Sequence, residues 1–322
     1  MLKTPNVPAA FFGIILGLVG LGGCWREASR IWNAPAAVGE SVMAIAVAVW
    51  VLLVLLYAAK WMWRRAEAVR EVEDPVQCCF VGLLPVSTML ISLVALPYSY
   101  PVAAALGIAG GAGQLAFAVY RTGQLWTGGR NPESTTPVLY LPTAGGNFVS
   151  AIVATAFDLP DLAALLFGAG LLSWFALESF LMHRLYVHAP LAPPLRPTLG
   201  IQLAPAVVGC SAYLSLTSGP PDLIAKGLLG YGLLQALIIA RMLPWIMVQP
   251  FAVSYWAFTF GITSIAFDAM KFVERGMDGL APPLAYATFA VANISIAIVT
   301  LGTACLFIRG RILPAPMSTI PT

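Results

Sequence analysis

Charged residues are scarce in this sequence. Of its 322 residues, 10% are charged and 59% are hydrophobic, whereas about 25% of the residues in an average soluble domain are charged. So little charge cannot cover a water-facing surface of ordinary composition, and this excludes a soluble globular protein. We therefore expect a protein whose surface is in contact with membrane lipid.

Groups that carry catalysis or bind metals are also few. The two histidines, His183 and His188, are five residues apart and so lie on different faces of a helix. The five cysteines, including the adjacent pair Cys78 and Cys79, show no metal-binding or redox spacing. Paired carboxylates and a nucleophile beside a base are missing as well. We expect neither an enzyme, nor a cofactor, nor a bound metal, and no nucleic-acid partner.

Long apolar runs are abundant by contrast. A helix needs about 20 apolar residues to cross the roughly 30 Å hydrocarbon core of a bilayer. Barrel strands are short and alternate in polarity, so continuous runs of this length indicate helices. Ten runs qualify, near residues 8–25, 37–62, 78–97, 102–121, 138–156, 161–183, 198–217, 223–242, 251–273 and 282–308. The predicted fold is an all-α, multi-pass integral membrane protein with ten transmembrane helices in one domain, 1–322.

The basic residues predict the orientation of these spans. One side of the membrane would hold both termini and the connections that follow even-numbered spans. Twelve of the seventeen basic residues fall on that side: Lys3, Lys60, Arg64, Arg65, Arg70, Arg121, Arg130, Arg184, Arg196, Arg241, Arg309 and Arg311. The other side has Arg26, Arg30, Lys226, Lys271 and Arg275. Because basic residues concentrate in cytoplasmic loops, we expect both termini to be cytoplasmic and the protein to lie in the plasma (inner) membrane.

Similar motifs recur about every 60 residues along the chain. The stretches "LLPVST", "YLPTAGG" and "QLAPAVVG" place Pro85, Pro142 and Pro205 in spans three, five and seven, and the next interval ends at Phe260. Tight turns rich in Pro and Asp join each of these odd spans to the following even span. A repeat of one hairpin predicts five helical hairpins around a central pore, with quasi-fivefold symmetry.

Small and polar residues accompany the three prolines. Proline kinks a membrane helix and frees a carbonyl, which is tolerated where protein or water satisfies that group. Three kinks at matching depth predict the wall of a water-filled path, although small residues also allow close helix packing. The predicted pore-lining residues are Gly17, Pro85, Ser87, Thr88, Pro142, Thr143, Gly146, Pro205, Ala206, Gly261 and Thr263.

Taken together, seven motifs resemble the tellurite-resistance/dicarboxylate transporter family, which includes bacterial TehA and the slow anion channels of plant guard cells. They are "FFGIILGL", "LLPVSTML", "GQLAFAVYRTGQLWTGG", "LYLPTAGGNF", "LAPAVVGCSAYLS", "GYGLLQALIIARMLPW" and "WAFTFG", and they cover nearly the whole chain. The resemblance implies a homotrimer in which the odd helices of each subunit line its own pore. It also implies that Phe260 projects into this pore opposite Gly13, so we expect Phe260 to act as the gate.

Two functions remain open at this point. The first is a passive channel for small anions, gated by Phe260. The second is a secondary transporter that exports or exchanges C4-dicarboxylates or toxic oxyanions such as tellurite. The odd spans have almost no cation near their middle, and no broken helix that presents its N-terminus to a substrate is evident, which favours the channel. Glu178 and Asp268, as acids that could couple transport to protons, are the best support for the transporter.

Overall fold

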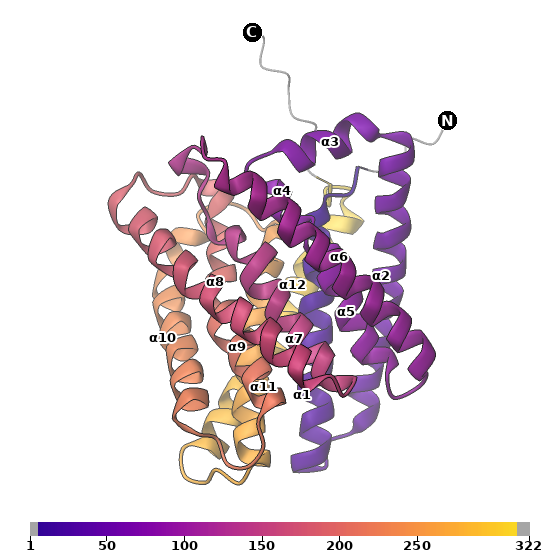
Figure 1. The fold of residues 1–322 in the computed structure, drawn as a ribbon, viewed down its shortest axis with the longest axis vertical. Coiled ribbons are helices and arrows are strands. Elements are labelled where there is room, and N and C mark those ends of the chain that lie inside the picture. The colour runs from indigo at the N-terminus through magenta and orange to yellow at the C-terminus, as the bar shows by residue number, and fades with distance from the viewer. Residues whose placement is uncertain (1–5, 314–322) are drawn as a thin grey trace.

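The computed structural model describes residues 6–313, and this part of the chain is entirely helical apart from its connections (Figure 1). Lys3 and the two ends of the predicted domain lie outside the described residues. Within residues 6–313, nine helical segments are long and apolar enough to cross a membrane. The segment predicted at 251–273 instead divides into a 3-10 helix, η6 (Val253–Phe258), and a 16-residue helix, α11 (Thr259–Glu274). The all-helical membrane fold is confirmed, while the count of ten spans stays a prediction.

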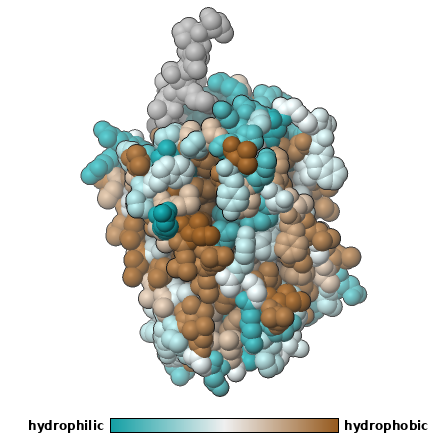
Figure 2. Space-filling view, turned by 90° about the vertical axis from the view of Figure 1, so that its left-hand side faces the viewer, coloured by the Kyte–Doolittle hydropathy of each residue, from teal (hydrophilic) through white to brown (hydrophobic). Residues whose placement is uncertain are grey.

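Five long α-helices form the periphery of the bundle. They are α2 (Ala36–Trp63), α6 (Tyr100–Trp126), α8 (Pro160–Val187), α10 (Leu223–Ile246) and α12 (Ala281–Ile308). Between 17% and 33% of the residues in their most apolar windows are buried. Figure 2 shows large apolar patches in the middle of one face, with weakly polar and some hydrophilic side chains between them. Exposed apolar surface of this kind fits contact with lipid.

The segments between these helices are broken, and they form the centre. The five segments are η1 (Ala9–Phe12) with α1 (Gly13–Trp32), α4 (Gln77–Phe80) with α5 (Leu83–Ala95), η3 (Pro137–Leu139) and the π-turn η4 (Leu141–Gly145) with α7 (Gly146–Ala156), η5 (Pro193–Leu203) with α9 (Ala204–Leu216), and η6 with α11. The first four of them bury 61% to 72% of their apolar windows. Each central segment therefore has a break before its longer α-helix begins, and in four of the five the first part is a 3-10 or π-helix.

The repeated prolines lie at these changes of geometry. Pro85 and Pro205 stand in the first turn of α5 and α9, and Pro142 stands in the π-turn before α7. Proline is well tolerated in a first helical turn because the missing N–H would have no intrahelical partner there. The prediction of proline kinks inside continuous helices is corrected accordingly. The chain stays hydrogen-bonded across the breaks, since the Gly13, Ala204 and Thr259 N–H groups donate to carbonyls of the preceding 3-10 helices.

A buried ion pair anchors the N-terminal segment. Glu71, on α3 (Arg65–Glu73), accepts hydrogen bonds from Lys60 Nζ at 2.8 Å and Tyr57 Oη at 3.1 Å. Its other oxygen accepts from the Ala9 N–H at 2.8 Å, and Lys60 also donates to the Val7 carbonyl. A buried charge needs this degree of pairing to be tolerated. The contacts fix η1 beside the first of the two cavities described next.

Candidate functional site

A cavity of about 350 Å³ lies near both ends of the described chain, and we call it the proximal cavity. Pro8 and Leu313 both border it, which places the start and the end of the described residues at the same end of the bundle. Most of its wall is apolar and comes from the central segments: Gly13, Leu16, Leu83, Leu141, Ile201, Ala204, Ala257 and Phe260. Among the described residues that line it, only Arg311 is charged.

A second cavity, of about 260 Å³, lies farther along the same central segments, and we call it the distal cavity. Its wall includes Gly20, Leu90, Ile152, Val208, Ser211, Phe260, Thr263, Ser264 and Phe267. Three charged side chains of α1 also line it, namely Arg26, Glu27 and Arg30. Since a water molecule takes up roughly 30 Å³ in the liquid, either cavity has room for several of them.

Phe260 is the residue that the two cavities share. No other residue in the described part of the chain lines both of them. Its side chain is half-buried and packs against the edge of the hydrophobic core. An apolar ring therefore stands where the two cavities meet.

Two threonines hold the start of α11 against α1. Oγ1 of Thr259 lies 2.3 Å from where a Cβ on Gly17 would be, and Oγ1 of Thr263 lies 2.1 Å from the same position on Gly20. Any side chain on either glycine would collide with α11. The threonine hydroxyls donate to carbonyls one turn earlier, Thr259 to Trp256 at 2.7 Å and Thr263 to Thr259 at 3.0 Å. Positions 259 and 263 of α11 thus face α1.

Gly261 fixes another side of α11. A Cβ on this residue would lie 2.4 Å from Leu203 Cβ and 3.3 Å from the Ala204 backbone nitrogen. Glycine therefore allows α11 to pack directly on the junction of η5 and α9. With positions 259, 261 and 263 all turned toward neighbouring segments, the Phe260 side chain is left facing the cavities.

Three of the residues predicted at the gate and pore wall border a cavity in this structure, namely Gly13, Phe260 and Thr263. The nearest atoms to a Cβ on Gly13 would be Leu83 Cδ1 at 3.9 Å and Trp256 Cβ at 4.0 Å. The ring of Phe260 is thus more than 4 Å from that position, although both residues line the proximal cavity.

The other predicted lining residues lie elsewhere. In the described chain, neither cavity wall includes Gly17, Pro85, Ser87, Thr88, Pro142, Thr143, Gly146, Pro205, Ala206 or Gly261. Many of them support packing or local hydrogen bonds instead. A Cβ on Gly146 would overlap Gln114 Nε2 of α6, which donates to the Pro142 carbonyl at 2.8 Å. The hydroxyls of Ser87 and Thr88 donate to the Leu84 carbonyl of their own helix.

Leu141 and Ala204 are wall residues that the sequence prediction missed. They directly precede Pro142 and Pro205, just as Phe260 directly precedes Gly261. The wall residue thus lies one residue before the second and third repeated prolines, and two residues before the first one, where Leu83 lines the cavity. The prolines attract attention in a sequence, but successive helical residues point about 100° apart, so neighbours on the chain face different surroundings.

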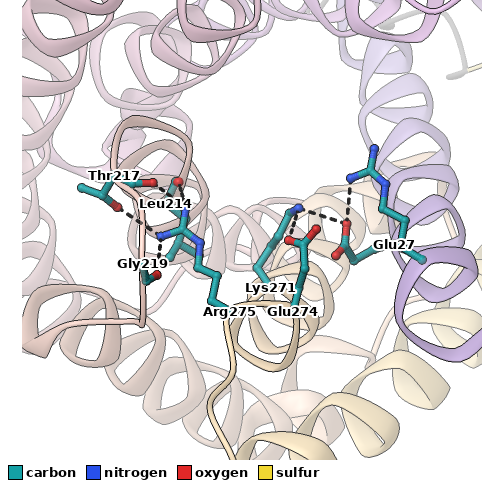
Figure 3. Close-up of polar contacts among 8 residues, drawn as sticks. Glu27, Leu214, Thr217, Gly219, Lys271, Glu274 and Arg275 are labelled. Carbon is teal, nitrogen blue, oxygen red and sulfur yellow. Dashed lines mark hydrogen bonds and ion pairs between the residues drawn. The ribbon is translucent and has the colours of Figure 1, made fainter.

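Charged side chains from α1 and from the end of α11 form a cluster beside the distal cavity (Figure 3). Oε2 of Glu27 lies 3.1 Å from Lys271 Nζ and 3.3 Å from an Arg30 guanidinium nitrogen. Lys271 also pairs with Glu274 at 2.5 Å. Figure 3 shows Lys271 extending from α11 toward Glu27 on α1, while Arg275 points away toward the Leu214, Thr217 and Gly219 carbonyls to which it donates. The Arg275 side chain thus links the end of α11 to the end of α9 and the residues that follow it.

A second ion pair lies beside this cluster. Arg26 pairs with Glu40 of α2 at 2.8 Å. Tyr98, in the turn before α6, donates its hydroxyl to the same carboxylate. The hydrogen bond to this anionic acceptor raises the pKa of the Tyr98 hydroxyl, so it remains a neutral donor. Of the three charged residues in the distal wall, Arg26 is therefore already matched by an acid.

Glu178 of α8 is held in a hydrogen-bond network. It accepts from the hydroxyls of Tyr140 and Tyr231, each at 2.5 Å, from Trp174 Nε1 at 2.9 Å and from Gln202 Nε2 at 3.0 Å. Glu178 lines neither cavity in the described part of the chain. Its contacts join α8, α10 and two central segments, which is a structural role.

Asp268 of α11 is the other acid considered for proton coupling. It is fully buried, and its Oδ1 accepts from Ser211 Oγ at 2.6 Å, while Oδ2 has no partner among the described residues. Ser211 borders the distal cavity, so Asp268 lies one side chain behind the wall. Within residues 6–313, no three His, Cys, Asp or Glu residues are grouped closely enough to hold a metal ion.

The fold is that of a helical membrane protein with two cavities that meet at Phe260. Residues 6–305 match the SLAC1 family, described as voltage-dependent anion channel. The chain is 35% identical over 310 residues to the tellurite resistance protein TehA homolog of Haemophilus influenzae, covering 96% of this chain and 93% of that protein. Two uncharacterised transporters of Methanocaldococcus jannaschii are 21% and 22% identical over 65% of this chain and 68% of their own lengths. The protein therefore belongs to the SLAC1 family of anion transport proteins, also called the tellurite-resistance/dicarboxylate transporter family, which confirms the resemblance seen in its motifs.

Proposed function

We propose that this protein is a passive anion channel whose closed gate is the ring of Phe260. The single observation that carries the proposal is that Phe260 alone, among the described residues, borders both cavities. An apolar side chain at a constriction blocks ions by its size and by excluding water. When the ring turns aside, the two cavities would join into one path through the central segments.

The charges of the two walls favour anions. Among the described residues, the walls contain Arg311 at the proximal cavity and Arg26, Glu27 and Arg30 at the distal one, a formal net charge of 3 − 1 = +2. The positive charge of Arg311 raises the local concentration of anions at the proximal entrance, whereas the distal arginines are matched by Glu40 and Glu27. Both walls are uncharged near Phe260, so an anion would bind weakly there and pass quickly, as conduction requires.

We further propose that the proximal end is cytoplasmic and that the protein is a homotrimer in the plasma (inner) membrane. The orientation rests on the twelve of seventeen basic residues assigned to that side. The trimer rests on the family resemblance, in which each subunit has its own pore. Lipid would contact the exposed apolar faces of the peripheral helices.

A secondary transporter of C4-dicarboxylates or oxyanions such as tellurite is the second candidate. The buried and incompletely paired Asp268 favours it, because a carboxyl group behind the distal wall is suited to binding a proton during transport. The printed name of the Haemophilus influenzae relative, which refers to tellurite resistance, points the same way. The hydrogen-bonded Glu178 gives this candidate no further support.

Ion selectivity distinguishes the two candidates. The Phe260→Ala protein would be reconstituted in planar bilayers under a potassium chloride gradient, with the wild type as the control. A passive anion channel predicts a current that reverses at the chloride equilibrium potential at any pH. Reversal at the potassium equilibrium potential would contradict anion selectivity. Electrically silent, saturable uptake that depends on a proton gradient would instead establish the transporter.

A further inference from the structure

Glu27 is the only acidic residue, within the described chain, that lines either cavity. Its side chain is 1% exposed. The other charged residues that line the distal cavity are both arginines, Arg26 and Arg30. One oxygen, Oε2, lies between Arg30 and Lys271, at 3.3 Å and 3.1 Å. A negatively charged oxygen already occupies the place between two cations at the distal end of the path.

The pairing of Glu27 is unlike that of a purely structural carboxylate. Its Oε1 is buried and has no hydrogen-bond partner among the described residues. Buried polar atoms that serve stability are nearly always hydrogen-bonded. The Glu71 carboxylate at the other end of the molecule shows the contrast, because both of its oxygens have partners. Stability alone thus does not account for a buried acid at position 27.

The cluster of Arg30, Lys271, Glu27 and Glu274 has no net charge, because each cation is paired with an acid. Arg30 and Lys271 contribute two positive charges, and Glu27 and Glu274 contribute two negative charges, so the sum is zero. The Arg30 side chain is 63% exposed and its only acidic partner in the described residues is Glu27. Because the Arg30 guanidinium is open to solvent and lies 3.3 Å from Glu27 Oε2, an anion from solution is able to compete with Glu27 for Arg30.

We infer that Arg30 and Lys271 form a binding site for a small monovalent anion at the distal mouth, and that the Glu27 carboxylate occupies this site as an internal competitor. The inference rests on the proposed anion conduction and names the group that limits anion entry from the distal side. A permeating halide or small carboxylate takes the place of Glu27 Oε2 between the two cations. The Glu27 side chain thereby lowers the affinity of the mouth and prevents an anion from being held too tightly.

The test uses Glu27→Gln, which keeps the shape of the side chain and removes its charge. In the Phe260→Ala background, current would be measured while chloride on the distal side is varied and ionic strength is held constant with a large impermeant anion. The half-saturating chloride concentration is expected to fall about fivefold, because the carboxylate that competes with chloride for the two cations loses its charge. An unchanged or higher value would overturn the inference.

Asp278→Asn is the matched control. Asp278 lies in the exposed loop after α11, is assigned to the same membrane face, and contacts neither Arg30 nor Lys271. The Asp278→Asn variant removes one negative charge from that membrane face, as Glu27→Gln does, but leaves the Glu27 carboxylate between Arg30 and Lys271. Its half-saturating concentration should stay within about twofold of the parent, since Asp278 forms no ion pair with either cation and exposed charges are screened by salt. An equal fall for both variants would show a general field effect and contradict a local site.

Arg30→Gln tests the same site if Glu27→Gln fails to fold, because an exposed arginine is replaceable without loss of structure. It should raise the half-saturating concentration, and no change would overturn the inference. Thermal stability of the detergent-solubilised protein supplies a readout that needs no current: chloride should protect Glu27→Gln at lower concentrations than wild type. Absence of chloride current in the Phe260→Ala parent would contradict the proposed function, whereas the stability comparison would still decide the site.

Discussion

At the scale of single residues, the environment of Phe260 follows from its neighbours on α11. Thr259 and Thr263 pack on glycines of α1, and Gly261 packs on the backbone near Leu203. These contacts fix three sides of the helix and leave position 260 at the boundary of the two cavities. The small side chains around Phe260 allow α11 to pack closely on its neighbours. The large side chain of Phe260 faces the cavities instead.

Arg311 carries a prediction at this scale, because it is the only charged residue that lines the proximal cavity in the described chain. Arg311→Gln should lower anion current from the proximal side about two- to threefold at low salt, because one positive charge is removed from the proximal entrance. The loss should disappear near 1 M salt, where the Debye length is about 3 Å. Bilayer recordings at several salt concentrations would measure it.

Arg309→Gln is the control for this prediction. Arg309 is exposed, lies two residues earlier at the end of α12 and lines neither cavity. Its current should equal that of the parent at every salt concentration. Equal losses in the two variants would show that Arg311 acts only through net charge.

At the scale of elements, the apolar runs predicted where the helices lie, but not which face of each helix borders a cavity. The run at 138–156 became η3, η4 and α7 over nearly the same residues. Its Pro142, Thr143 and Gly146 do not reach a cavity wall, because the π-turn and the contact with Gln114 turn them elsewhere. Hydropathy reports that a segment is buried in a bilayer, but which face meets a neighbour depends on residues from another helix.

The packing of α1 on α11 gives a prediction for helix assembly. Gly20→Ala should lower stability by about 1–3 kcal/mol, as overpacking does, because its Cβ would lie 2.1 Å from Thr263 Oγ1. Gly23→Ala, on the same helix with no atom within 4 Å of its Cβ position, should be neutral. Thermal unfolding in detergent would compare them. Adding Thr263→Ala to Gly20→Ala should restore part of the loss, and identical melting temperatures for the two glycine variants would contradict the contact.

At the scale of the whole molecule, long outer helices surround five broken central segments, and the broken segments enclose the cavities. The repeat of about 60 residues predicted this division into outer and central segments, since its proline motifs, at Pro85, Pro142 and Pro205, fall in alternate runs. The existence of two cavities divided at Phe260 was not predictable from composition. It depends on Leu141, Ala204 and other apolar wall residues that carry no distinctive sequence signal.

Cysteine labelling tests the division of the path in a Cys305→Ser background, in which the remaining four native cysteines are buried. Leu141→Cys should react with a membrane-impermeant thiol reagent only from the cytoplasmic side, and Ile152→Cys only from the outer side, because they line different cavities. Adding Phe260→Ala should let either reagent reach both positions. Leu165 is exposed on α8 at the periphery of the bundle. A cysteine at this position should not react with the reagent when the protein is in lipid. Labelling of both wall positions from one side with Phe260 intact would contradict a closed gate.

The conductance of Phe260 variants tests the central claim most directly. Wild type, Phe260→Leu and Phe260→Ala would be recorded in the same bilayers, with Phe148→Ala, which removes a fully buried core ring, as the control. The gate predicts anion currents that rise from wild type through leucine to alanine, by about tenfold for each 1.4 kcal/mol removed from the barrier. Phe148→Ala should lose about 3–5 kcal/mol of stability and gain no current. A folded Phe260→Ala protein, equal to wild type in melting temperature and electrically silent at all voltages, would contradict the assignment of Phe260 as the gate.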